Sequence, residues 1–170
     1  MAKKVALIAE SGAVARAAPD SIEEEIGKFR LQRAPGFLFR QMDARSTALF
    51  LASAVDPDIT PRQFGLLMTL YQSGPMLQSD LGRAMCIDRS TLGEMLSRML
   101  ERGLVERRAW PQDRRVSQIA ITDSGKDLFR THFSAARRSQ QELLAPLRED
   151  EREFFLNCLV RLTDAFSEER

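Results

Sequence analysis

The segment from Asp88 to Gly103 constrains the fold of this chain more than any other. Its apolar residues recur at the spacing i, i+3, i+4, i+7 and i+8 of one helix face: Leu92, Met95, Leu96, Met99 and Leu100. The opposite face is polar: Arg89, Ser90, Thr91, Glu94, Ser97 and Arg98. Asp88 is a typical N-cap, and Gly103 is a typical residue just past a helix end. We therefore expect an amphipathic helix with one face in a core and the other offering hydrogen-bonding groups to solvent or a partner.

The sequence period changes from helical to extended directly after this helix. Residues 104–109 and 116–121 are predicted strands, with Ile119 and Ile121 on one face. The residues between them, Pro111-Gln112-Asp113, are typical of a turn. The sequence therefore predicts a β-hairpin after the helix.

Helical patterns fill the rest of the chain. Thr60 followed by Pro61 predicts a strong helix start, and Thr122 predicts the start of a long helix that Pro146 ends. The expected helices cover about residues 36–55, 60–73, 78–85, 88–102, 122–144 and 150–167. The fold class predicted is mainly α with one β-hairpin. Strands and helices do not alternate, which disfavours nucleotide-binding α/β folds.

Residues 1–34 stand apart from this pattern. A short helix around 21–32 is indicated by Ser21 and Glu24, which have capping-box spacing. We expect this segment to be an N-terminal arm, either mobile or lying as a strap over a dimer.

Charge and cysteine content exclude several classes of protein. The net charge is only +1, but residues 89–115 hold seven Arg against four acids, whereas residues 149–170 hold seven acids against three Arg. One basic face and one acidic end suggest that one side of the molecule binds phosphate. The two cysteines lack metal-ligand spacing, and the apolar run after Lys4 is too short for a signal peptide. We expect a cytoplasmic protein with no metal site, no cofactor and no membrane span.

A short helix, a turn, an amphipathic helix and a basic hairpin together form a physical argument for DNA binding. The second helix of such a unit enters the major groove and reads bases with its N-terminal residues, which here are Arg89, Ser90 and Thr91. Ser97 and Arg98 lie further along and are better placed for phosphate. The alternative for each Arg is an ordinary solvated face.

The run from Leu81 to Thr122 resembles the MarR family of winged helix-turn-helix regulators. The resemblance is carried by four segments: Asp88-Arg89-Ser90-Thr91, Arg102-Gly103-Leu104-Val105-Glu106-Arg107, Asp113-Arg114-Arg115 and Ile121-Thr122-Asp123-Ser124-Gly125. It implies that Asp113 braces a wing through Arg114 and that Arg115 reaches the minor groove. It also implies a MarR-like domain over 35–170, with the winged helix-turn-helix at about 60–122 and dimerisation helices at about 36–55 and 123–168.

The resemblance implies a homodimer that binds a pseudo-palindromic operator on double-stranded DNA, most often as a repressor. Such regulators are commonly released by a small effector, often an aromatic acid, and an acyl thioester is a second option. The effector-binding residues expected here are Arg40, Arg45, Phe50, Phe64 and Met68. Core packing of the apolar residues and solvation of the two Arg are the alternatives.

The sequence also gives a structural expectation for each of four single residues. Leu77 stands where relatives usually cap a helix with Ser or Thr, and Cys86 stands where Gly is common, which costs strain if the backbone there is left-handed. Trp110 is expected to pack on the hairpin, and His132, the lone histidine, to be a half-buried structural residue. A redox role for Cys86 is a weaker alternative.

Three other functions compete with a sequence-specific regulator. An enzyme needs a nucleophile with a base, paired carboxylates or metal ligands, and the sequence shows no such pattern, so we expect no catalytic residues. A winged-helix module that binds protein need not keep Arg89, Arg98 and Arg115 exposed. An architectural DNA binder without a sensor is the third alternative, with little sequence preference.

Overall fold

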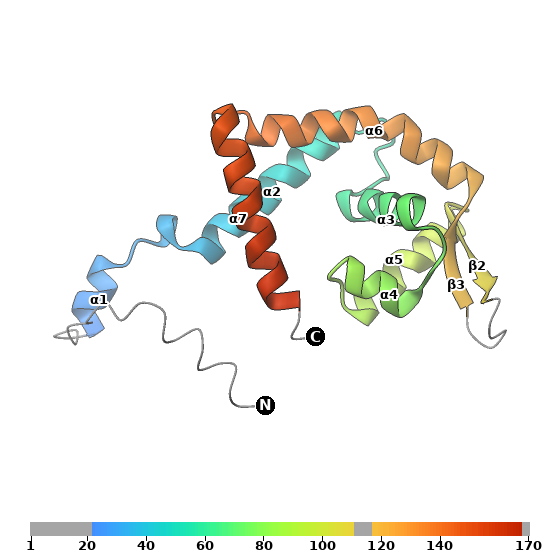
Figure 1. Cartoon of the computed structure of the whole chain (residues 1–170), viewed down its shortest axis with the longest axis horizontal. Helices are drawn as coiled ribbons and strands as arrows, with labels where there is room; N and C mark the ends of the chain where they lie inside the picture. Colours follow the sequence, from blue (N-terminus) through green and yellow to red (C-terminus); the bar gives the residue numbers. More distant parts are fainter. Residues whose placement is uncertain (1–21, 111–116, 168–170) are drawn as a thin grey trace. The chain divides into compact units, whose positions relative to one another are not determined.

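The computed structural model describes residues 22–110 and 117–167 (Figure 1). The chain divides into two compact units, one up to Arg40 and one from Gln41 onward.

The first unit contains two short helical segments and the start of a longer helix. Helix α1 spans Ile22–Lys28, a 3-10 turn (η2) spans Leu31–Arg33, and α2 begins at Pro35 and runs to Ser53 in the second unit. The single helix expected over 21–32 is therefore wrong in its extent, because α1 ends at Lys28. The proposed cap, Ser21, lies outside the described residues. No side chain of α1 is buried.

Capping residues set the start of the helices in the second unit. Helix α3 spans Pro61–Ser73, and Thr60 forms a complete capping box with Gln63: the Gln63 N–H donates to Thr60 Oγ1 at 3.2 Å, and the Thr60 N–H donates to Gln63 Oε1 at 3.0 Å. Helix α4 spans Gln78–Ala84, and α5 spans Arg89–Glu101. The predicted starts at Thr60 and Asp88 are confirmed. A cap of this kind stabilises its helix by about 1 kcal/mol.

The predicted apolar face of α5 is buried in the core. Leu92, Leu96 and Met99 are almost completely buried, and Gly103, with a φ of +65°, ends the helix as expected. These side chains belong to one hydrophobic cluster shared by α3, α4, α5, the sheet and α6. The rotation of α5 about its own axis is fixed by this burial, so its polar face is turned outward.

A three-stranded antiparallel sheet contains the predicted hairpin. Strands β2 (Val105–Ala109) and β3 (Ser117–Ile121) pair directly. A third strand, β1 (Met76–Leu77), pairs with the other edge of β3, so the order is β1-β3-β2. Two residues are too few to give a sequence period, which is why the prediction omitted β1.

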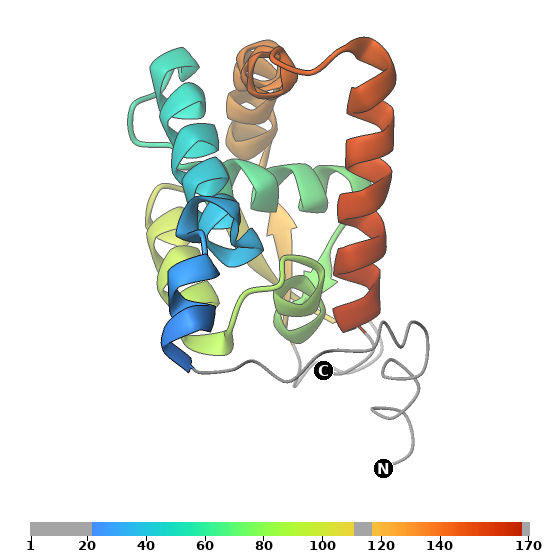
Figure 2. The same ribbon diagram turned by 90° about the vertical axis from the view of Figure 1, so that its left-hand side faces the viewer.

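The first turn of α6 packs directly on the backbone between α5 and β2. Helix α6 spans Asp123–Leu144 and is capped by Thr122, whose Oγ1 accepts from the Gly125 N–H at 3.0 Å. The same hydroxyl donates to the Gly103 carbonyl at 2.6 Å. Figure 2 shows α3 between α6 and the sheet, and α3 contacts both. A cluster of aromatic rings joins α2, α3 and α6. The ring centroids of Phe50 and Phe64 are 5.5 Å apart, and those of Phe64 and Phe129 are 5.3 Å apart.

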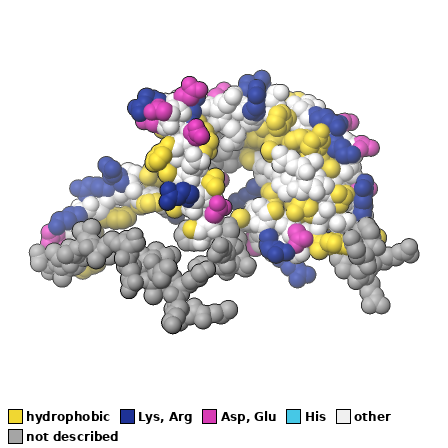
Figure 3. Space-filling model, in the orientation of Figure 1, with side chains coloured by type: hydrophobic (Ala, Val, Ile, Leu, Met, Phe, Trp, Pro, Cys, Tyr) yellow, Lys and Arg dark blue, Asp and Glu magenta, His cyan; other side chains and the backbone are white. Residues whose placement is uncertain are grey.

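Helix α7, Glu149–Ser167, exposes apolar side chains to solvent. The exposed fraction of the Phe154 side chain is 71%, and Leu156, Val160 and Leu162 are exposed as well. Figure 3 shows hydrophobic side chains on the visible surface of this helix. Such a face is typical of a surface that another protein chain covers. In the described part of the chain, no helix combines the length and apolarity that a membrane crossing needs.

Close packing at Gly125 gives a stability prediction. A Cβ atom at Gly125 would lie 2.1 Å from the Leu104 carbonyl oxygen, whereas a Cβ at Gly93 in α5 would meet no atom within 4 Å. Because the added methyl group would overlap with the Leu104 carbonyl oxygen, we expect Gly125→Ala to lower the free energy of unfolding by at least about 1–3 kcal/mol. Gly93→Ala should raise it by about 1 kcal/mol through helix propensity. Thermal unfolding of both variants tests this, and equal melting temperatures would contradict the packing described.

Candidate nucleic-acid interface and effector cavity

Asp88 holds the N-terminus of α5 through two hydrogen bonds from Thr91. The Thr91 N–H donates to Asp88 Oδ1 at 2.9 Å, and Thr91 Oγ1 donates to Asp88 Oδ2 at 2.6 Å. The bond from the Thr91 hydroxyl is the largest cause of a lowered pKa for the Asp88 carboxyl, and the bond from the Thr91 N–H adds to it. The cap therefore stays ionised and fixes where the helix begins.

This cap decides which of the predicted base-reading side chains are presented to the outside. Arg89 and Ser90 are exposed at the first turn of α5, with the apolar face of the helix behind them. Thr91 is half-buried, and its hydroxyl is engaged by Asp88. Arg89 and Ser90 thus have the geometry of base-reading residues, while Thr91 first of all maintains the cap. Contact of any of the three with DNA stays a prediction.

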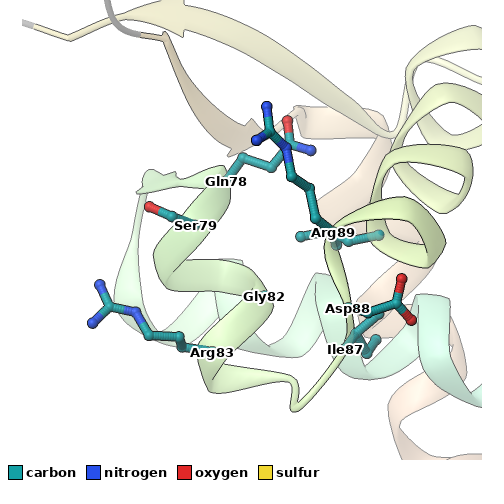
Figure 4. A pocket seen from close by; sticks show the side chains of 8 residues that line it. Gln78, Ser79, Gly82, Arg83, Ile87, Asp88 and Arg89 are labelled. Carbon is teal, nitrogen blue, oxygen red and sulfur yellow. The ribbon is translucent and has the colours of Figure 1, made fainter. Parts of the chain in front are cut away.

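A cavity of about 590 Å³ lies between α4 and α5, next to Arg89. Figure 4 shows the Arg89 side chain extending from the start of α5 toward Gln78 at the start of α4. Ser79 and Arg83 line the same cavity, and Arg83 pairs with Asp80 at 2.5 Å. Sequence reasoning did not single out Gln78 or Ser79. The signal available in the sequence was their place in the first turn of the helix that precedes α5.

The predicted phosphate-contacting residues lie further along α5. Ser97 is exposed and donates to Glu101 Oε1 at 3.4 Å. Arg98 is exposed and, with Thr91 and Met95, lines a second cavity of about 500 Å³ beside the start of α3. The structure therefore separates Arg98 from Arg89, because Arg98 points to the α3 side of the helix and Arg89 to the α4 side.

The turn between α4 and α5 contains a strained residue. Cys86 has a φ of +51°, a left-handed conformation that favours glycine. The expected strain at Cys86 is confirmed, and the thiol is exposed. Leu77 provides no side-chain cap for α4, also as expected.

The tip of the hairpin lies outside the described residues, and with it Asp113, Arg114 and Arg115. Their predicted roles in the wing stay predictions. On the described part of β2, Arg107 and Arg108 are exposed, and Arg108 Nε donates to Glu106 Oε1 at 2.6 Å. Trp110 follows β2 and is half-buried.

Three of the five predicted effector residues line one cavity. Phe50, Phe64 and Met68 surround a mostly apolar space of about 400 Å³ where α2, α3 and α6 meet. Phe133, Ala136, Arg137 and Gln140 of α6 line it from the other side, and Pro61 and Gly65 of α3 line it as well. Sequence reasoning missed these α6 residues, although their spacing i, i+3, i+4 and i+7 places them on one helix face.

Neither of the two predicted arginines lines that cavity. Arg45 is exposed on α2 and does not line the cavity. Arg40 is exposed and belongs to the first unit. The cation on the cavity wall is Arg137, and Gln140 lines the same cavity. An apolar space with a guanidinium and an amide at its edge suits a planar ring that carries a carboxylate.

Comparison with known proteins agrees with this arrangement. A model of the MarR family matches residues 59–117. The HTH-type transcriptional repressor NicR of Pseudomonas putida is 32% identical over 130 residues, which cover 76% of this chain and 82% of NicR.

Two solved structures extend the similarity to the fold. The PcaV transcriptional regulator from Streptomyces coelicolor, in complex with its natural ligand, has a TM-score of 0.73 and 32% identity over 81% of this chain and 96% of PcaV. Bordetella bronchiseptica BpsR, studied for the regulation of its DNA binding by 6-hydroxynicotinic acid, has a TM-score of 0.75 and 26% identity over 80% of this chain and 97% of BpsR. The chain belongs to the MarR family of winged-helix transcriptional regulators.

Proposed function

We propose that the protein is a ligand-responsive repressor that binds a pseudo-palindromic operator as a dimer and releases it when a small aromatic acid occupies the cavity lined by Phe64 and Arg137. The observation that carries the DNA-binding part is the exposed, capped first turn of α5, with Arg89 and Ser90 directed outward. An arginine there can donate two hydrogen bonds to guanine in the major groove.

A dimer would present two copies of α5 to the two halves of an operator. The apolar side chains exposed on α7 are the surface that we assign to the second copy, and covering them would bury area that water now contacts. Two-fold symmetry then favours half-sites about one helical turn, or about 10 bp, apart. The acidic start of α7 favours a position away from the phosphates.

The effector part of the proposal is supported by the cavity and by two relatives. PcaV has been solved with its natural ligand, and the DNA binding of BpsR is regulated by 6-hydroxynicotinic acid. Here, the cavity contacts both α3 of the DNA-binding lobe and α6, so an occupant that fits only one arrangement of these helices would shift the protein toward it. The volume of about 400 Å³ favours a single-ring acid, and an acyl thioester would have to extend outside it.

The DNA-binding proposal predicts a specific loss in the variant Arg89→Ala. The wild-type protein should prefer its own upstream DNA over a scrambled duplex of equal length by about a thousandfold or more. Arg89→Ala should weaken operator binding by about 10–100-fold and binding to the scrambled duplex by much less, because a base contact is lost. Fluorescence anisotropy with both duplexes, at two salt concentrations, measures this.

Arg98→Ala is the matched control on the same helix. If Arg98 contacts phosphate, Arg98→Ala should weaken binding to both duplexes by similar factors and should reduce the dependence of affinity on salt by about one unit of slope. Equal effects of the two substitutions on both duplexes would contradict the assignment of Arg89 to base reading. Failure of the wild-type protein to bind either duplex at low salt would favour the protein-binding module.

The effector proposal predicts release of the operator by aromatic acids. Benzoic acid and 6-hydroxynicotinic acid are suitable probes, added to the preformed complex with the operator. Met68→Trp fills the cavity, and Arg137→Ala removes its cation. Each variant should raise the acid concentration needed for release by about 10-fold or more. For Arg137→Ala, this factor corresponds to the loss of one charged hydrogen bond.

Arg138→Ala is the control, since Arg138 is the exposed neighbour of Arg137 on α6 and does not line the cavity. Release that is unaffected by Met68→Trp and Arg137→Ala would show that the cavity is not the effector site. No release by either acid would leave the acyl thioesters as the next probes.

A further inference from the structure

The lone histidine, His132, is held by hydrogen bonds on both ring nitrogens. It lies in α6 and is 2% exposed, so it is buried and not half-buried as the sequence led us to expect. Nδ1 lies 2.9 Å from the Leu128 carbonyl oxygen, and the backbone N–H of Asp56 donates to Nε2 at 2.7 Å. A backbone N–H can only donate, so Nε2 must carry a lone pair. The ring is therefore neutral, with its proton on Nδ1 and directed to Leu128.

Asp56 continues the connection from α6 to the end of α5. Its Oδ1 accepts from the Asp58 N–H at 2.8 Å, and its Oδ2 accepts from Arg102 Nη2 at 2.6 Å. Arg102 also donates to the Asp58 carbonyl oxygen at 2.9 Å through Nη1. Arg102 is the C-cap of α5. Three residues thus link the middle of α6 to the end of the recognition helix, with Asp56 of the loop before α3 binding His132 through its backbone N–H and Arg102 through its side chain.

The charge state of Asp56 suits this connection. Burial acts to raise the pKa of the Asp56 carboxyl, but the Asp58 N–H and the Arg102 guanidinium outweigh it, so the pKa is lowered. The carboxylate therefore remains ionised at neutral pH and continues to accept both bonds.

A second connection joins the same two helices at the start of α6. There Thr122 Oγ1 donates to the Gly103 carbonyl, and the Thr122 N–H donates to the Leu104 carbonyl at 3.1 Å. Thr122 and His132 are ten residues apart, or about 15 Å along the axis of α6. The two connections start at separated points on α6 and reach neighbouring residues, Arg102 and Gly103, at the end of α5, so together they fix where that end lies relative to α6.

We infer that the chain of contacts His132–Asp56–Arg102 fixes the position of the end of α5 relative to α6 and so sets the half-site spacing that a dimer accepts. His132 and Arg102 are then positioning residues, and this inference rests on the proposed DNA-binding function. His132 is followed by Phe133, which lines the effector cavity. An occupant that moves α6 at Phe133 would act on the same connection.

The ring protonation of His132 tests the first contact without DNA. With a single histidine in the sequence, tag-free full-length protein labelled with ¹⁵N at histidine gives one pair of ring signals. We expect the Nδ1–H tautomer at neutral pH and slow hydrogen exchange at the Asp56 amide. An Nε2–H tautomer, or rapid exchange at Asp56, would overturn the inference even if the protein binds DNA as proposed.

Operator spacing tests the positioning role. An operator selected from random duplexes with wild-type protein is lengthened or shortened by one base pair at its centre, which turns one half-site by roughly 35°. The wild-type protein should lose about 100-fold in affinity on this change, and Arg102→Ala should lose less than about 10-fold. His132→Leu should behave like Arg102→Ala, and His132→Gln, which keeps an acceptor for the Asp56 N–H, should restore the wild-type pattern.

Two further readouts separate positioning from other roles. Arg138→Ala, on the exposed side of α6, should keep the wild-type response to spacing. A reduction of the salt slope by about 1 in Arg102→Ala, with equal weakening on all spacings, would show a phosphate contact and overturn the inference. If the wild-type protein selects no operator, the proposed function fails, and the His132 ring signals still decide whether the connection exists.

Discussion

The burial of one face of α5 is the constraint on which the rest of the structure depends. Leu92, Leu96 and Met99 are almost fully buried in the common core, so the helix cannot rotate about its axis without exposing them, at a cost of about 1.5–3 kcal/mol for each. Its rotation is therefore fixed, and with it the direction of Arg89 and Ser90. The Asp88 cap adds the second condition, since it fixes the residue at which the helix begins.

Contacts at the other end of α5 hold the position of that end in the domain. Arg102 and Gly103 are bound by side chains from the loop before α3 and from the start of α6. Because the helices expected to form the dimer include α6 and α7, the same contacts relate the proposed DNA-reading surface to the dimer axis. The effector cavity lies against α6, so one helix connects the three parts of the proposed mechanism.

Local sequence signals predicted the features that depend on neighbouring residues. Thr60, Asp88 and Thr122 each cap a helix through a bond to a backbone N–H three residues later, a contact that sequence spacing encodes directly. Strand β1 was missed because its partner, β3, lies about forty residues away and two residues show no period. The role of His132 was also hidden, since its partner is the backbone N–H of Asp56, and a backbone donor leaves no mark in a sequence. Arg137 was passed over in favour of Arg40 and Arg45, because charge alone does not tell which helix face lines a cavity.

Base reading by Arg89 is the central claim, and methylation interference on the selected operator tests it most directly. Methylation of guanine N7 blocks an acceptor in the major groove, where a guanidinium would bind. The account predicts that methylated guanines interfere with wild-type binding in two clusters about one helical turn apart, and that one guanine in each cluster no longer interferes in Arg89→Ala. Interference that is the same in both proteins, or confined to the minor groove, would contradict it.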